Sequence, residues 1–223
     1  MTSLKGQTGR DHGSCSATAP AIVILAASAV FAAVARRVSS ARNEPLDQHV
    51  RDWTRGHQSA VLDVAVRPVT LLSIPILVVS MTTALALWLR REKRPAAARA
   101  VMLTPVVAAV AAEVLTRWLA LRNPPHAGDS PHGEVKDPSF PSGHTIGVTA
   151  EGLSIAYILL HEDLGPPAAV AALIAWPVVV GATRVYRDRH WLSDVVGGWI
   201  AGAGVAAAGV LLYRRGTTRP RRH

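Results

Sequence analysis

Cysteine, phenylalanine and acidic residues are all scarce in this chain of 223 residues. A single cysteine, Cys15, excludes an intramolecular disulfide framework and a cysteine-rich zinc site. Two phenylalanines, Phe31 and Phe140, provide few platforms on which nucleic-acid bases could stack. Charged residues make up only 17% of the chain and hydrophobic residues 49%. This composition excludes a disordered chain and disfavours an ordinary soluble globule.

The few charges that are present are mostly positive. Lysine and arginine number 24 against 15 aspartates and glutamates, which gives a formal net charge of +9. The basic residues lie between apolar runs and do not form one long block. This distribution suits anionic lipid head groups better than the groove of a nucleic acid, and we expect a membrane as partner and no nucleic acid.

Apolar runs dominate the chain, and each approaches the roughly 20 residues that a membrane helix needs. Spanning segments must pair their own backbone groups, so we predict an all-α polytopic membrane protein with six transmembrane helices. The first run is expected to be a retained anchor and not a cleaved signal peptide, because no clear small-residue cleavage site precedes Arg36. The predicted helices cover residues 19–35, 69–89, 98–121, 145–160, 167–183 and 191–213. They form one membrane domain, 19–215, between a basic N-terminal tail, 1–18, and a basic C-terminal tail, 216–223.

Residues 45–59 have a mixed composition. Leu46, Val50 and Trp53 are spaced four and three residues apart, which places them on one face of a helix. Either this segment is a short helix in the membrane interface, or it is a solvated connector.

The distribution of basic residues does not by itself orient the six helices. With the N-terminus inside the cell, inner and outer segments hold 12 lysines and arginines each. Five of the outer arginines lie in the polar segments that follow residues 98–121 and 167–183 or at the ends of those runs: Arg117, Arg122, Arg184, Arg187 and Arg189. If these five serve a function and are left out of the count, the inside holds 12 basic residues against 7 outside. This favours the cell membrane, with the active site on the outer face.

Two polar segments between the apolar runs carry reactive residues. The first follows residues 98–121 and ends in Pro141-Ser142-Gly143-His144; the second runs from Arg184 to Asp194. Because 145–160 and 167–183 form a hairpin, both segments open on the same face of the membrane.

These residues predict a phosphate site. Arginine forks match phosphate oxygens, and Ser142 and Gly143 stand at a helix N-terminus that offers free N–H groups. Asp194 lies four residues after His190 and can orient its imidazole as a nucleophile. His144 can supply a proton to a leaving group. The chain shows no cluster with metal-ligand spacing, and we expect neither a metal nor another cofactor.

The same residues resemble those of the type 2 phosphatidic acid phosphatases, the lipid phosphate phosphatases that share a core with the vanadium haloperoxidases. That family shows three motifs, K-x6-R-P, P-S-G-H and S-R-x5-H-x3-D. Residues 141–144 match the second motif completely, and Arg184-x5-His190-x3-Asp194 matches the third, with Thr183 in place of serine. The resemblance covers roughly residues 98–213.

The first motif departs from the family pattern. Arg117 takes the place of the lysine, and Pro124, which cannot bind phosphate, takes the place of the arginine. We hypothesise that Arg122, two residues earlier, replaces the motif arginine; alternatively, Arg122 extends to lipid head groups.

The resemblance implies a role for each matching residue. His190 becomes a phosphohistidine, Asp194 orients it, and His144 protonates the leaving group and then activates water. Phosphate oxygens are held by Arg117, Arg122, Arg184, Ser142 and the Gly143 N–H.

The implied activity is hydrolysis of a lipid phosphate, such as a polyprenyl phosphate or diphosphate, phosphatidic acid or phosphatidylglycerol phosphate. A catalytically weak membrane protein that binds anionic lipid is the alternative. A haloperoxidase-like enzyme is disfavoured, because those relatives are soluble.

Overall fold

The computed structural model describes residues 18–42, 44–125 and 137–217. Both tails proposed from the sequence therefore lie almost wholly outside the described residues. The described part is helical, and it contains no strand. Its helices are α1 (Thr18–Ser39), α2 (Glu44–Gly56), α3 (Ala60–Leu72), α4 (Pro75–Arg91), α5 (Pro95–Leu119), α6 (Gly143–Glu162), α7 (Pro167–Tyr186) and α8 (Leu192–Thr217).

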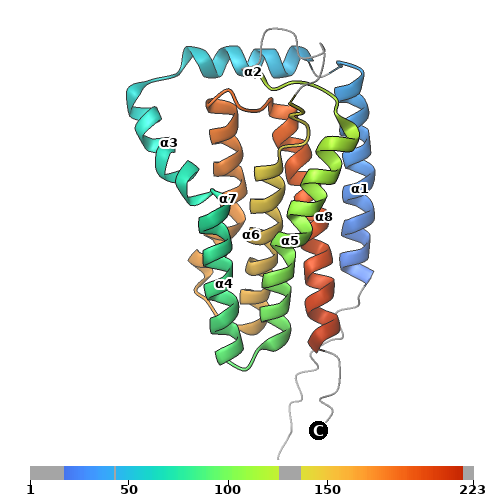
Figure 1. The fold of residues 1–223 in the computed structure, drawn as a ribbon, viewed down its shortest axis with the longest axis vertical. Helices are drawn as coiled ribbons and strands as arrows, with labels where there is room; N and C mark the ends of the chain where they lie inside the picture. The colour runs from blue at the N-terminus through green and yellow to red at the C-terminus, as the bar shows by residue number, and fades with distance from the viewer. Residues whose placement is uncertain (1–17, 43, 126–136, 218–223) are drawn as a thin grey trace, which may run out of the picture.

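Helix α6 lies at the centre of the bundle and packs against α5, α7 and α8, while α1 packs against α8. These helices run along the long axis of the molecule, and α2 lies across one end of it (Figure 1). Helix α3 descends from α2 toward α4. Helix α1 begins, and α8 ends, at the end of the bundle opposite α2 (Figure 1).

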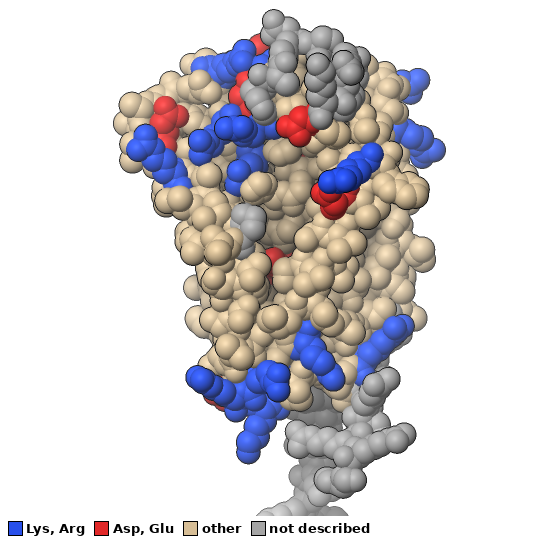
Figure 2. Space-filling view, in the orientation of Figure 1, with Lys and Arg blue, Asp and Glu red and all other residues tan. Residues whose placement is uncertain are grey.

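Four helices, α1, α5, α7 and α8, are long and apolar enough to cross a membrane. The pair α3 and α4 adds a fifth if the two form one broken span. On the face seen in Figure 2, most charged side chains lie near the two ends, with uncharged surface between them. The prediction of an all-helical integral membrane protein is confirmed, and the count of six spans is not.

Helix α6 accounts for one difference from the predicted count. It corresponds to the run 145–160, but it is not among the helices apolar enough to span alone. Neighbouring helices enclose it, and Thr145, Thr149 and Ser154 are buried in the bundle. Because these three hydroxyl side chains face protein, α6 does not need the uniformly apolar surface that lipid contact demands.

The predicted helix 69–89 is broken in two. Helix α3 ends at Leu72 and α4 begins at Pro75, with a bend of 51° between them. Proline lacks a backbone N–H and biases the preceding residue toward extended conformations, so Pro75 begins a new helix. The sequence reasoning also missed residues 60–68 as helix, because Asp63 and Arg67 interrupt the apolar run.

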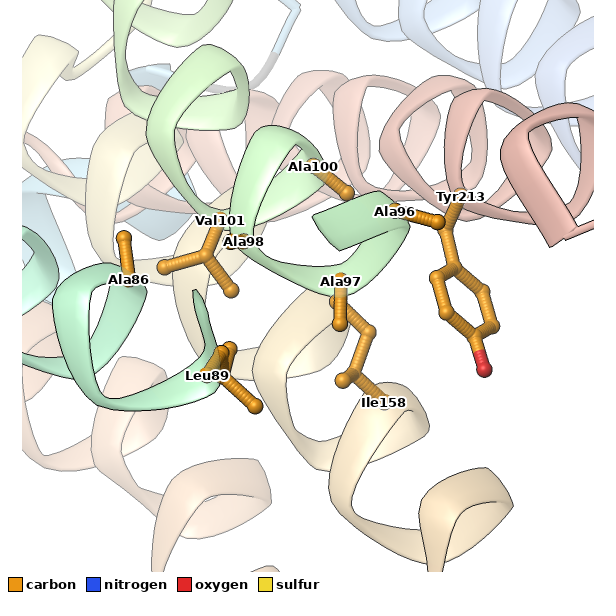
Figure 3. Packing of buried hydrophobic residues seen from close by; sticks show 9 residues of the cluster. All are labelled: Ala86, Leu89, Ala96, Ala97, Ala98, Ala100, Val101, Ile158 and Tyr213. Carbon is orange, nitrogen blue, oxygen red and sulfur yellow. The ribbon is translucent and has the colours of Figure 1, made fainter. Parts of the chain in front are cut away.

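Small residues dominate the buried cluster at the end of the bundle where α4 ends and α5 begins (Figure 3). Leu89 of α4, Ile158 of α6 and Tyr213 of α8 surround a run of alanines from α5. Alanine lets helix backbones approach closely, which replaces the hydrophobic driving force that lipid does not provide. This end therefore packs closely through small side chains.

We expect Gly202→Ala to destabilise the fold by about 1–3 kcal/mol, because there is no room for a methyl group between α8 and α6. An added Cβ would lie 2.6 Å from the Thr149 Cβ and 2.7 Å from the Ile146 carbonyl oxygen. Thermal unfolding in detergent measures the effect. Gly204→Ala is the control, since its nearest neighbour, the Ala27 Cβ, is 3.5 Å away. Equal melting temperatures for the two variants would contradict this packing.

Candidate active site

A cavity of about 400 Å³ opens at the end of the bundle where α2 lies. Its wall brings together the start of α6, the end of α7 and the loop before α8, so the two polar segments meet as the sequence predicted. The lining residues are Thr70, Pro124, Asp137, Pro138, Ser139, His144, Arg184, Arg187, Arg189 and His190.

His190 is held by a buried carboxylate. Its Nδ1 lies 3.4 Å from Asp194 Oδ2, and the same oxygen accepts a hydrogen bond of 3.0 Å from the backbone N–H of Trp191. The Asp194 side chain is completely buried. A carboxylate beside Nδ1 favours the tautomer that carries its proton there, which leaves the lone pair on Nε2.

Arg122 lies behind Asp194 and does not line the cavity. Its Nε and Nη2 donate to Asp194 Oδ1 at 3.0 and 2.7 Å, and its Nη1 donates to Asp47 Oδ2 at 2.7 Å. Nη2 also donates to the hydroxyl of Ser193. Only 2% of the Arg122 side chain is exposed, so this guanidinium is committed to protein carboxylates.

Helix α2 packs through its polar face on the loop between α7 and α8, the start of α8 and the segment that follows α5. Asp47 accepts hydrogen bonds from the Ser193 N–H and hydroxyl, while Arg51 donates to Asp188 and to the Pro125 carbonyl. Leu46 and Trp53, on the apolar stripe, are exposed. The sequence reasoning recognised this apolar stripe but missed the polar stripe of α2. Asp47 and Arg51 are also four residues apart, which places them on one face of the helix.

Asp188, in the loop between α7 and α8, secures the other end of α2. Burial raises the pKa of this carboxyl, but hydrogen bonds from Arg51 and Arg55 outweigh that effect and hold its pKa below the usual value. Asp188 is therefore ionised at neutral pH. Because its pKa is lowered in the folded state, this stabilisation is present above the usual carboxyl pKa and is lost as the pH falls below it.

Arg184, Arg187 and Arg189 give the cavity a positive wall. Arg184 is buried; its Nη2 donates to Ser73 Oγ at 2.6 Å, and its Nε has no hydrogen-bond partner among the described residues. A buried guanidinium N–H without an acceptor points to an anion as the missing group. Arg187 and Arg189, which the sequence analysis did not single out as site residues, also line the cavity wall.

The remaining predicted phosphate-binding residues do not line this cavity. The Arg117 side chain is 78% exposed and forms the i, i+4 ion pair with Glu113 that its spacing predicts. Ser142 is completely buried and accepts a hydrogen bond of 2.9 Å from the Thr145 hydroxyl. Gly143 lines a neighbouring cavity that shares His144 with the first.

Over the described residues, no group of three or more histidine, cysteine, aspartate or glutamate side chains could hold a metal ion. The ionisable residues that line the cavity are three arginines, two histidines and one aspartate, Asp137, and the excess of basic groups suits an anion.

Comparison with known proteins confirms the resemblance seen in the sequence. Residues 118–217 match the family model of the PAP2 superfamily. The crystal structure of a transmembrane PAP2-type phosphatidylglycerolphosphate phosphatase from Bacillus subtilis has the same fold, with a TM-score of 0.66 and 20% sequence identity. The match covers 90% of this chain and 98% of that one. No curated protein matches this chain.

We expect Arg122→Ala to destabilise the fold by about 3–5 kcal/mol, because it strands Asp47 and Asp194 as buried carboxylates without a cation. Thermal or denaturant unfolding in detergent measures the loss. Arg67→Ala removes an exposed arginine from α3 and should change stability by less than about 0.5 kcal/mol. Similar small changes for both variants would show that Arg122 is not the buried hub described above.

Proposed function

We propose that this chain, whose residues 118–217 match the PAP2 superfamily, is an integral membrane lipid phosphate phosphatase that acts through a phosphohistidine. One observation carries the proposal: His144 and His190 line the same arginine-walled cavity, and His190 is held by a buried aspartate. Its substrate is a phosphomonoester or diphosphate of a membrane lipid. Polyprenyl phosphates and diphosphates, phosphatidic acid and phosphatidylglycerol phosphate all present the required anion.

The arginine wall supports phosphate binding. Arg184 lines the cavity and its Nε has no hydrogen-bond partner among the described residues, and Arg187 and Arg189 add positive charge beside it. His144 lies in the first turn of α6, so the positive end of that helix dipole is near the cavity. These cations and dipoles can stabilise the charge that builds up on the transferring phosphoryl group, so we propose that no metal is needed.

In the first step, Nε2 of His190 attacks phosphorus. A P–N bond forms as the bond from phosphorus to the lipid oxygen breaks, and His144 gives its proton to that oxygen. Asp194 stabilises the positive charge that develops on the imidazole ring of His190.

The second step reverses these roles with water. His144 now takes a proton from a water molecule, whose oxygen attacks phosphorus. The P–N bond breaks and His190 recovers its lone pair, while inorganic phosphate leaves with the new P–O bond. The first step removes one proton from the pair of histidines and the second returns one from water, so the full cycle leaves their number of protons unchanged.

The cavity is proposed to face the outside of the cell membrane. It lies at the end of the bundle opposite the start of α1 and the end of α8 (Figure 1). Of the 12 basic residues assigned to this side, Arg51 and Arg122 are buried and three others line the cavity, which leaves 7 against 12 on the inner side. The surplus at the inner end agrees with the positive-inside rule.

A catalytically weak protein that binds anionic lipid is the second candidate. It is favoured by the positions of Arg117 and Arg122, neither of which lines the cavity. An assay of phosphate release separates the two functions, because the second candidate binds lipid phosphate but releases no inorganic phosphate.

His190→Ala should lower phosphate release by a thousandfold or more, because the attacking nitrogen is lost. Purified protein in detergent micelles, supplied with a panel of lipid phosphates, gives the rate. His49→Ala, an exposed histidine on α2 outside the cavity, should keep the wild-type rate. Unchanged turnover in His190→Ala would refute the phosphohistidine mechanism.

Chelation with EDTA should leave the activity intact, and vanadate should inhibit it. Vanadate adopts a trigonal-bipyramidal form that resembles phosphorus during transfer. Rates measured with and without each reagent provide the test. Loss of activity with EDTA that magnesium restores would show that a metal, and not the arginine wall, stabilises the transition state.

A further inference from the structure

An apolar groove leads from the catalytic cavity into the membrane-spanning part of the bundle. A second cavity, of about 220 Å³, shares His144 with the first, and a third, of about 450 Å³, shares Val148 and Glu151 with the second. One stripe of α6 lines the groove, with residues spaced three or four apart as far as Leu159. Figure 2 shows this face hollowed below its upper group of basic side chains, with acidic atoms on the floor of the hollow.

Glu151 interrupts this otherwise apolar lining. Apart from His144, it is the one ionisable side chain that lines the second or third cavity. No hydrogen bond or ion pair holds its carboxyl within the described part of the chain, although a polar group at membrane depth is costly when it lacks a partner. A polar group of a bound lipid could act as the hydrogen-bond partner of this carboxyl.

Its position relative to the catalytic histidine constrains that ligand. Glu151 lies seven residues after His144 on the same face of α6, which places their Cα atoms about 10.5 Å apart along the helix axis. The Cα–Cβ bonds of a helix tilt toward its N-terminus, so the Glu151 carboxyl leans toward the phosphate end. A lipid phosphate bound beside His144, with its chain in the groove, would place the part that directly follows the phosphate next to Glu151.

We infer that Glu151 recognises the ester linkage of a diacylglycerol-type lipid phosphate, which makes it a specificity-determining residue for glycerolipid substrates. This inference rests on the proposed phosphatase function and assigns its substrate class. In apolar surroundings the neutral acid is the less costly form of a carboxyl, and it carries one O–H that can donate. The ester carbonyls of a diacylglycerol phosphate lie one glycerol unit from phosphorus and accept such a bond.

Polyprenyl phosphates lack this acceptor. Their hydrocarbon chain begins directly after the phosphate ester, so Glu151 would face an apolar isoprene unit and remain unsatisfied. An unpaired buried donor disfavours that complex, because a site built to hydrogen-bond its substrate rejects the analogue that lacks the group. The groove around Glu151 supplies apolar contact for a hydrocarbon chain in either complex, acyl or isoprenoid.

The test compares diester phosphatidic acid with its dialkyl ether analogue, which has no carbonyl oxygens. Wild-type protein should hydrolyse the diester with a kcat/KM roughly three- to tenfold higher, which corresponds to one hydrogen bond. Glu151→Leu should bring the two values within about twofold by losing activity on the diester. Glu151→Gln, which keeps an N–H donor, should retain most of the preference.

Glu113→Leu is the matched control, since it removes an exposed carboxyl from α5 outside the groove. It should keep the wild-type preference. The inference is overturned if wild-type protein shows no preference, if Glu151→Leu retains it, or if Glu151→Leu lowers both rates equally. Glu151→Leu removes the unsatisfied donor, so it should hydrolyse polyprenyl phosphate at least as fast as wild-type protein. A loss on polyprenyl phosphate that parallels the loss on the diester would also overturn the inference.

A binding measurement separates this inference from the proposed activity. Dissociation constants of the diester and ether lipids are measured by native mass spectrometry on His190→Ala protein, with and without Glu151→Leu. If wild-type protein releases no phosphate from any lipid, the proposed function fails. The ratio of the diester and ether dissociation constants still tests whether Glu151 recognises the ester. Glu151→Leu should change this ratio, and an unchanged ratio contradicts the inference.

Discussion

A guanidinium shared between two carboxylates is buried at the end of the bundle where the cavity opens. Arg122 joins Asp194 of α8 to Asp47 of α2, and all three side chains are at most 2% exposed. Burying such charges costs several kcal/mol per ion, and only close pairing with further hydrogen bonds offsets that cost. Asp47 and Arg122 therefore secure α2 over the site, and Asp194 can hold His190 only because its other oxygen is already satisfied.

This arrangement divides the arginines of the site into two groups. Arg51 and Arg122 are paired with carboxylates and fix the loops, whereas Arg184, Arg187 and Arg189 face the cavity. The first group neutralises the charge of Asp188 and Asp194, so the second group keeps its charge for an incoming anion. A phosphate in the cavity consequently meets three arginines, against one lining carboxylate, Asp137, among the described residues.

Periodicity and spacing predicted the parts that depend on local sequence. Apolar runs located most of the helices, and the i, i+4 spacing of His190 and Asp194 predicted their contact. The position of Arg122 could not be predicted from local spacing, because its partner Asp47 lies 75 residues earlier in the chain. Their contact depends on how α2 packs over the site. Likewise, the contact of Arg184 with Ser73 depends on the break between α3 and α4. Motif spacing alone therefore suggested phosphate contacts for Arg117 and Arg122, which the tertiary structure places elsewhere.

The central claim is that His190 carries the phosphoryl group between the two steps of hydrolysis. Rapid quenching of the wild-type protein with a lipid phosphate radiolabelled on phosphorus tests it directly. We expect a phosphoramidate on His190, stable in base and labile in acid, that is absent from His190→Ala protein. Turnover without any labelled protein, or a label on another residue, would contradict the account.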